Sequence, residues 1–252
     1  MKCTRSATSG VSFLFFFLIT AASGLSQTGS ISCKVIFKGV LPQELTFKHN
    51  LSTESCGKQV PLDRLVVGKD NDVQYSLLYL KNPPYGSVAG MKPAIIDQQH
   101  CRYVPHMSIA AKGSTLEMIN SDGVLHTSHG YLYTGMERST TFNLAQPIVG
   151  QRTQQQVRKS GMIEIECDAG HVWMTSWVWV TPSPYAAITN EHGECIIDNI
   201  PPGTYTLIMW HEGWKIKSYD AAGRPKFSDP VAMEREVTVV AGKTTTITFE
   251  LR

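Results

Sequence analysis

Apolar and polar residues alternate along much of the chain, a pattern typical of β-strands with one buried face. In residues 162–167, Ile163, Ile165 and Cys167 fall on one face, whereas Glu164 and Glu166 fall on the other. Similar runs lie at 31–37, 73–80 and 115–119, and clusters of Gly, Pro, Asn and Asp separate them as turns do. Helical periodicity is nearly absent. The pattern therefore predicts an all-β protein built from sandwiches or barrels of short strands.

The clearest boundary is the sequence Thr-Pro-Ser-Pro at 181–184, where two prolines end a strongly apolar strand. We expect a first domain over residues 27–182 and a smaller second β-sandwich over 183–252. The last two strands of the second sandwich should form a hairpin that turns at 241–243. An alternative stays open, because the first strand, 31–37, looks like the opening strand of such a small sandwich. In that alternative the first domain is an insertion, and a Cys33–Cys195 disulfide closes the seam.

The first 26 residues have the composition of a secretory signal peptide. Lys2 and Arg5 precede an apolar run at 11–19 that is too short to span a bilayer, and small residues follow at 21–24. These features predict an exported protein, periplasmic or secreted, and we expect no membrane span in the remainder. The formal charge of +2 comes from 23 basic and 21 acidic residues without a dense basic run, so no nucleic acid partner is expected.

Five cysteines follow the signal peptide, at positions 33, 56, 101, 167 and 195. Cysteines of exported proteins tend to form disulfides, and an odd count leaves at least one without a partner. A thiolate that binds a metal would explain such a cysteine. If Cys167 has this role, the other four can form two disulfides in three alternative pairings.

The sequence CDAGHVWM, residues 167–174, places a thiol, an imidazole and a thioether within one loop. Cys167 lies on the apolar face at the end of its strand, where a buried thiolate requires a compensating cation. A strand and an Asn-Ser-Asp-Gly turn precede His126, 41 residues earlier, and a β-sandwich can bring two such segments together. His126, Cys167, His171 and Met174 then form the ligand set of a type 1 copper site with a weak axial Met.

Several motifs resemble those of bacterial cupredoxin-like proteins of the methylamine-utilisation type. In that family a type 1 copper domain with a Greek-key sandwich is followed by a carboxypeptidase regulatory-like, transthyretin-like sandwich. The motifs cover almost all of the chain after the signal peptide: Cys56, IDQQHCRYVPH (96–106), NSDGVLHTSHG (120–130), FNLAQP (142–147), CDAGHVWM, and NIPPGTYTLIMWHE (199–212).

The resemblance implies one type 1 copper, with His126, Cys167 and His171 as equatorial ligands and Met174 as the axial ligand. It also implies a Cys56–Cys101 disulfide. The chain departs from the family pattern in two places. Thr127 stands where the family has an Asn that ties the two ligand loops together, and three residues instead of two separate Cys167 from His171. His129 is expected at the surface or, with Thr127, in the layer behind the ligands.

The sequence contains no nucleophile elbow, phosphate-binding loop or zinc protease motif, so we do not expect an enzyme. We expect an exported protein that carries single electrons between redox protein partners, which would dock at an exposed edge of His171 beside Trp173. Two alternatives stay open. The protein could deliver or store copper, or it could be a surface interaction or carbohydrate-binding module without redox activity.

Overall fold

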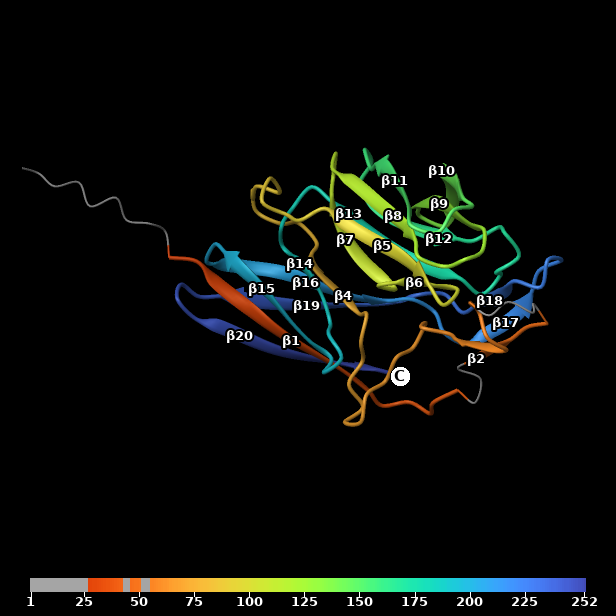
Figure 1. Ribbon diagram of the computed structural model, residues 1–252. Helices are drawn as coiled ribbons and strands as arrows, with labels where there is room; N and C mark the ends of the chain where they lie inside the picture. The colour runs from red at the N-terminus through yellow and green to blue at the C-terminus, as the bar shows by residue number, and fades with distance from the viewer. Residues whose placement is uncertain (1–26, 43–45, 51–54) are drawn as a thin grey trace, which may run out of the picture.

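The computed structural model describes residues 27–42, 46–50 and 55–252 (Figure 1). All regular elements of these residues are β-strands, which confirms the predicted all-β class. The expected signal peptide, residues 1–26, lies outside the described residues. In the described part of the chain, no helix is long and apolar enough to cross a membrane.

One sandwich, here called the inserted sandwich, is formed by residues 94–181. Its five-stranded sheet has the order β10-β9-β12-β13-β7, and its four-stranded sheet has the order β11-β8-β5-β6. The pairs β13/β7 and β5/β8 are parallel, and the other pairs are antiparallel. The strands are β5 (Ala94–Gln99), β6 (Arg102–Val104), β7 (Met107–Ala111), β8 (Thr115–Asn120), β9 (His126–Thr134), β10 (Glu137–Gln146), β11 (Gln151–Gln156), β12 (Gly161–Glu166) and β13 (Thr175–Thr181).

The second sandwich, here called the host sandwich, includes strands from both sides of the inserted one. Its sheets have the orders β15-β1-β20 and β14-β4-β16-β19. The strands are β1 (Gly29–Phe37), β4 (Leu77–Leu80), β14 (Ala186–Ile188), β15 (Glu194–Ile200), β16 (Gly203–His211), β19 (Val231–Val239) and β20 (Thr244–Leu251). The expected division at 182 therefore does not describe the strand pairing, because β1 and β4 join sheets whose other strands come after residue 182.

The expected hairpin at the end of the chain is wrong. The turn exists, since Lys243 donates its amide to the carbonyl of Val240 and Gly242 has a φ of +67°. However, β19 and β20 join opposite sheets, and β20 pairs in parallel with β1. The physical reason is that the two strands contribute apolar side chains, Val237 and Phe249 among them, to one core from opposite sheets.

Three apolar clusters order the sheets into layers. One fills the inserted sandwich and one fills the host sandwich. A third lies between the two sandwiches, around Leu77, Met107 and Trp177. Strand β13 illustrates why: Val178 and Val180 face the inner core, whereas the alternate Trp177 and Trp179 face the host sandwich. The two sandwiches are therefore packed against each other over an aromatic interface.

Two short hairpins complete the fold: β2 (Thr46–Lys48) with β3 (Gln59–Pro61), and β17 (Ile216–Tyr219) with β18 (Pro225–Phe227). The Cys56–Cys101 disulfide is formed, as the family resemblance implied. Cys33 and Cys195 lie directly opposite each other on β1 and β15 and are thiols in the structure. Their mutual hydrogen bond and burial raise the pKa of the Cys195 thiol.

Candidate metal centre

Three of the four predicted ligands meet at one end of the inserted sandwich. His126 begins β9, Cys167 directly follows β12, and His171 lies in the loop that joins β12 to β13. Because β9 and β12 are antiparallel neighbours, with His129 opposite Glu166, the end of β12 lies beside the start of β9. Strand register alone therefore brings His126 to the loop 167–174, here called the metal loop.

The donor atoms of these three side chains form a compact group. The Sγ of Cys167 is 3.8 Å from Nδ1 of His126 and 3.6 Å from Nδ1 of His171. One donor atom of each residue lies within 4.8 Å of those of the other two. Relative exposure is 0% for His126 and Cys167 and 4% for His171, so the group is closed to bulk water. Both imidazoles present the same ring nitrogen to the sulfur, as two ligands of one ion would.

Backbone hydrogen bonds fold the metal loop back on itself. The amide of Met174 donates to the carbonyl of His171 at 2.9 Å, and the amide of Cys167 donates to the carbonyl of Met174 at 3.4 Å. Gly170 makes this possible, because its φ of +88° is one that residues with a side chain rarely adopt. Met174 is buried in the same apolar cluster as Cys167. Its assignment as axial ligand stays a prediction.

A carboxylate that the sequence did not identify orients His126. Oδ2 of Asp122 lies 2.9 Å from Nε2 of His126, which leaves Nδ1 directed at Cys167. Asp122 is itself held by the amides of His100 and Cys101, both at 2.8 Å. These two residues form the β5–β6 turn with positive φ values of 53° and 56°. Such a carboxylate behind a histidine fixes the ring and makes it a stronger ligand.

Thr127 contacts the donor group, whereas His129 contacts only neighbouring residues. The hydroxyl of Thr127 accepts the amide of Asp168 at 2.6 Å, and the amide of Thr127 donates to Sγ of Cys167 at 3.4 Å. Thr127 thus links the segment that begins with His126 to the metal loop. His129 faces away from the sulfur, with Nδ1 2.6 Å from the carboxylate of Asp168 and Nε2 2.9 Å from the hydroxyl of Thr140.

The surroundings stabilise a thiolate. Burial acts to raise the pKa of Cys167, but hydrogen bonds from His126, His171 and the amide of Thr127 outweigh it and lower the pKa to about 5. Burial acts to lower the pKa of His126, but hydrogen bonds to Asp122 and Cys167 raise it to about 9. Without a metal, the two side chains form a thiolate–imidazolium pair at neutral pH.

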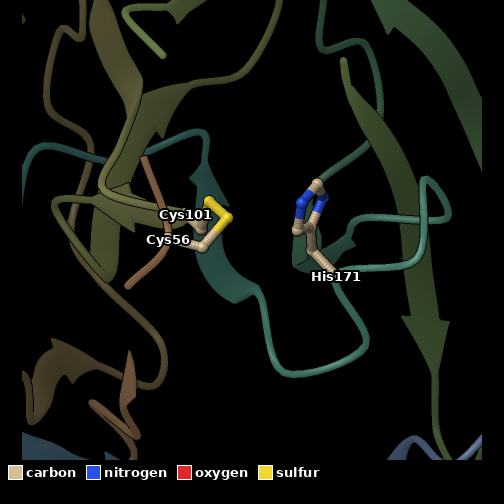
Figure 2. Close-up of side chains that lie close together, drawn as sticks. All are labelled: Cys56, Cys101 and His171. Carbon is tan, nitrogen blue, oxygen red and sulfur yellow. A yellow bond between two sulfur atoms is a disulfide. The ribbon is translucent and has the colours of Figure 1, made fainter. Parts of the chain in front are cut away.

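This donor set fits a soft metal ion. One thiolate and two imidazoles, buried beside a thioether-bearing loop, match the preference of copper or zinc. They do not provide the oxygen ligands that magnesium or calcium need. A second group near His171 does not offer the same chemistry. It contains Cys56 and Cys101, whose sulfur atoms are joined in the disulfide that Figure 2 shows beside the His171 ring, and a disulfide lacks the thiolate that binds metals.

The expected docking edge at His171 is buried. Trp173 is 5% exposed and meets the His171 ring edge to face, and Phe47 and His49 of the β2 segment stack on Trp173. Exposed apolar side chains lie instead near His126: Leu125 is 46% exposed, Ile148 65% and Val149 62%. The Asn120 side chain joins their two loops, since it donates to the carbonyls of Val124 and Gln146.

A cleft of about 1000 Å³ lies between the sandwiches, outside the metal centre. Its lining includes aromatic side chains such as Trp179 and Trp210 and the charged residues Glu164, Glu166 and Arg138. Strand alternation places these glutamates on the face of β12 opposite to Cys167, as the sequence predicted.

Comparisons with known proteins give partial matches. The family model described as polysaccharide lyase family 4, domain II, matches residues 179–247, so the match is not to a carboxypeptidase regulatory-like domain. No curated protein matches significantly. Among solved structures, a purple cupredoxin from Nitrosopumilus maritimus is 21% identical over 35% of this chain and 99% of its own, with a TM-score of 0.31.

Two further structures are copper proteins. A reduced, Cu(I) form of an amicyanin mutant is 15% identical over 41% of this chain and 98% of its own, with a TM-score of 0.31. A copper-containing nitrite reductase from Thermus scotoductus is 19% identical over 40% of this chain and 25% of its own, with a TM-score of 0.29. Similarities of this size do not assign a function, which must come from the side chains themselves.

Proposed function

We propose that the protein is an exported type 1 copper protein that carries single electrons between redox protein partners and catalyses no reaction itself. The observation that supports this most strongly is the position of the Cys167 sulfur, 3.8 Å and 3.6 Å from the Nδ1 atoms of His126 and His171. Met174 would be the fourth ligand. Copper, when bound, supplies the Cu(II)/Cu(I) couple through which one electron is stored and passed on.

The side chains support this task in three ways. Cys167 supplies a thiolate at neutral pH, because its pKa is lowered to about 5. Asp122 and Thr127 hold His126 and the metal loop in place, so that the donors need not rearrange between oxidation states. Burial of all three donors excludes water as an additional ligand.

The exposed side chains of Leu125, Ile148 and Val149 are the proposed docking surface for a redox partner. They lie at the end of the inserted sandwich that carries His126, which follows Leu125 directly in the chain. A small apolar surface suits a short-lived complex, because electron-transfer contacts bury little area.

The absorption and electron spin resonance spectra of the purified protein after copper addition test the proposal. We expect an intense visible thiolate-to-Cu(II) band that Cys167→Ser abolishes. Absence of both the band and tight copper binding would refute the proposal. Rapid transfer of bound Cu(I) to a chelator would favour copper delivery over electron transfer.

A further inference from the structure

The β17–β18 hairpin lies outside the strands of the inserted sandwich (Figure 1). Arg224, in the turn of this hairpin, contacts the metal loop. Its Nη2 donates to the carbonyl of Cys167 at 2.8 Å, and its Nη1 donates to the carbonyl of Val172 at 3.2 Å. One guanidinium therefore bridges two carbonyls, one of Cys167 itself and one of the residue after His171. Their separation matches the planar fork of an arginine, which lysine lacks.

The hairpin is shaped to present this side chain. Oδ1 of Asp220 accepts the amides of Ala222 and Arg224, at 3.0 Å and 2.9 Å, which closes the turn locally. Gly223 has a φ of +80° and allows the chain to reverse just before Arg224. Contacts within the hairpin therefore hold the backbone of Arg224 in place independently of the metal loop.

Arg224 is 8% exposed, so its charge must be compensated within the protein. Its Nε lies 3.5 Å from Oε2 of Glu166, and Glu166 also pairs with Arg138 at 2.7 Å. A second acidic contact, from Nη2 to Asp168, is 3.4 Å long. With two carbonyls and two carboxylates around it, the guanidinium is held in one orientation.

We propose that Arg224 is a positioning residue for the metal loop, so that the hairpin completes the metal centre without supplying a ligand. The assignment of the loop as copper-binding rests on the proposed function, but the restraint exists before any metal arrives. Arg224 holds the carbonyls of Cys167 and Val172, and His171 lies between them along the chain. The loop is consequently kept in the conformation in which His171 faces the Cys167 sulfur.

Amide hydrogen exchange of the full-length, metal-free protein tests the restraint directly. In Arg224→Met, we expect exchange in residues 168–174 to be at least about tenfold faster, because the loop loses both carbonyl contacts. Arg224→Lys should restore protection only in part, since lysine cannot bridge two carbonyls. Glu166→Gln removes the ion pair but keeps the carbonyl contacts, so it should accelerate exchange in the loop less than Arg224→Met.

Lys226→Met is the matched control, because Lys226 lies two residues further on the same hairpin and contacts Asp220 instead of the metal loop. It should leave exchange in 168–174 unchanged. Unchanged exchange in a folded Arg224→Met protein, or acceleration of the same size throughout the chain, would overturn the proposal. If Arg224→Met does not fold, exchange in residues 168–174 is compared between Arg224→Lys and Lys226→Met. Faster exchange in Arg224→Lys supports the proposal, and equal exchange overturns it.

A second measurement addresses the metal itself. In copper-loaded Arg224→Met, we expect transfer of Cu(I) to a chelator to be at least about tenfold faster, together with an altered Cu(II) hyperfine splitting. Absence of both the copper band and tight copper binding in the unaltered protein would refute the proposed function, whereas the exchange experiment would still decide the role of Arg224. The two ideas can therefore fail separately.

Discussion

Cys167 should be a thiolate at neutral pH even in the metal-free protein. Its pKa is lowered from an ordinary 9.0 to about 5, although burial acts in the opposite direction. At 1.36 kcal/mol per pKa unit, this difference corresponds to about 5 kcal/mol in favour of the thiolate. Hydrogen bonds with His126 and His171 are the largest contributions that lower the pKa. The thiolate should therefore depend on the two imidazoles.

The perturbation that tests this is His126→Ala. Since the hydrogen bond from His126 is the largest contribution that lowers the pKa of Cys167, we expect the titration midpoint to rise by at least about 2 pH units, towards the value of a free thiol near about 8.5. The assay is the ultraviolet thiolate absorbance of the metal-free protein as a function of pH. Subtracting the titration of Cys167→Ser removes the contribution of the other cysteines.

The control is His129→Ala, because His129 lies three residues further on β9 but contacts Asp168 and not the Cys167 sulfur. His129→Ala should change the titration midpoint of Cys167 by no more than a few tenths of a pH unit, on the order of a small pKa perturbation. A Cys167 that titrates near 9.0 in the unaltered protein, or one whose midpoint does not respond to His126→Ala, would contradict the reasoning.

Three further predictions follow from the same structure. Copper affinity should fall about tenfold for each pH unit below about 9, because the ion must displace a proton from His126, whose pKa is raised to about 9. A competition titration that shows no pH dependence of the affinity would refute this. Cys56→Ala should lower the free energy of unfolding, measured in urea, by about 4 kcal/mol, because the lost disulfide closes a loop of 45 residues and restricts the unfolded chain. A loss below about 1 kcal/mol would contradict this estimate of the loop entropy. Glu212→Gln should destabilise the protein by about 3 kcal/mol, because Arg64 loses its 2.6 Å partner in a buried site; a neutral effect would show that Glu164 alone satisfies Arg64.

Local patterns in the sequence predicted the β-strands and the faces on which their side chains lie. Alternation along 162–167 placed Cys167 on the inner face and the glutamates on the outer face, and both assignments agree with the structure. The expectation that a β-sandwich brings His126 to the loop of Cys167 and His171 rested on the predicted fold class and the family resemblance, and the three side chains do lie together. A disulfide between Cys56 and Cys101 was implied by the family resemblance and is present.

Interactions between distant segments could not be predicted in this way. Asp122 was visible only as part of a turn, since nothing local shows that its carboxylate meets the His126 ring. Arg224 lies 57 residues after Cys167, in a polar stretch without any strong pattern. Parallel pairing of β1 with β20 was likewise invisible, because alternation specifies which face is buried but not which strand lies alongside.

The insertion of one sandwich into the other also has a consequence for the order in which the protein folds. Ser30 on β1 contacts Thr244 on β20 across 214 residues, so the host sheet is complete only after the last strand has been synthesised. Strands β5 to β13 are complete in the chain long before then, and their contacts close shorter loops. The inserted sandwich should thus acquire its core first, and the host sandwich should close around an already folded unit. Arg224 comes from a hairpin of this late stage. Newly made protein should therefore pass through a state in which His126, Cys167 and His171 lie together but the metal loop is not yet restrained by Arg224.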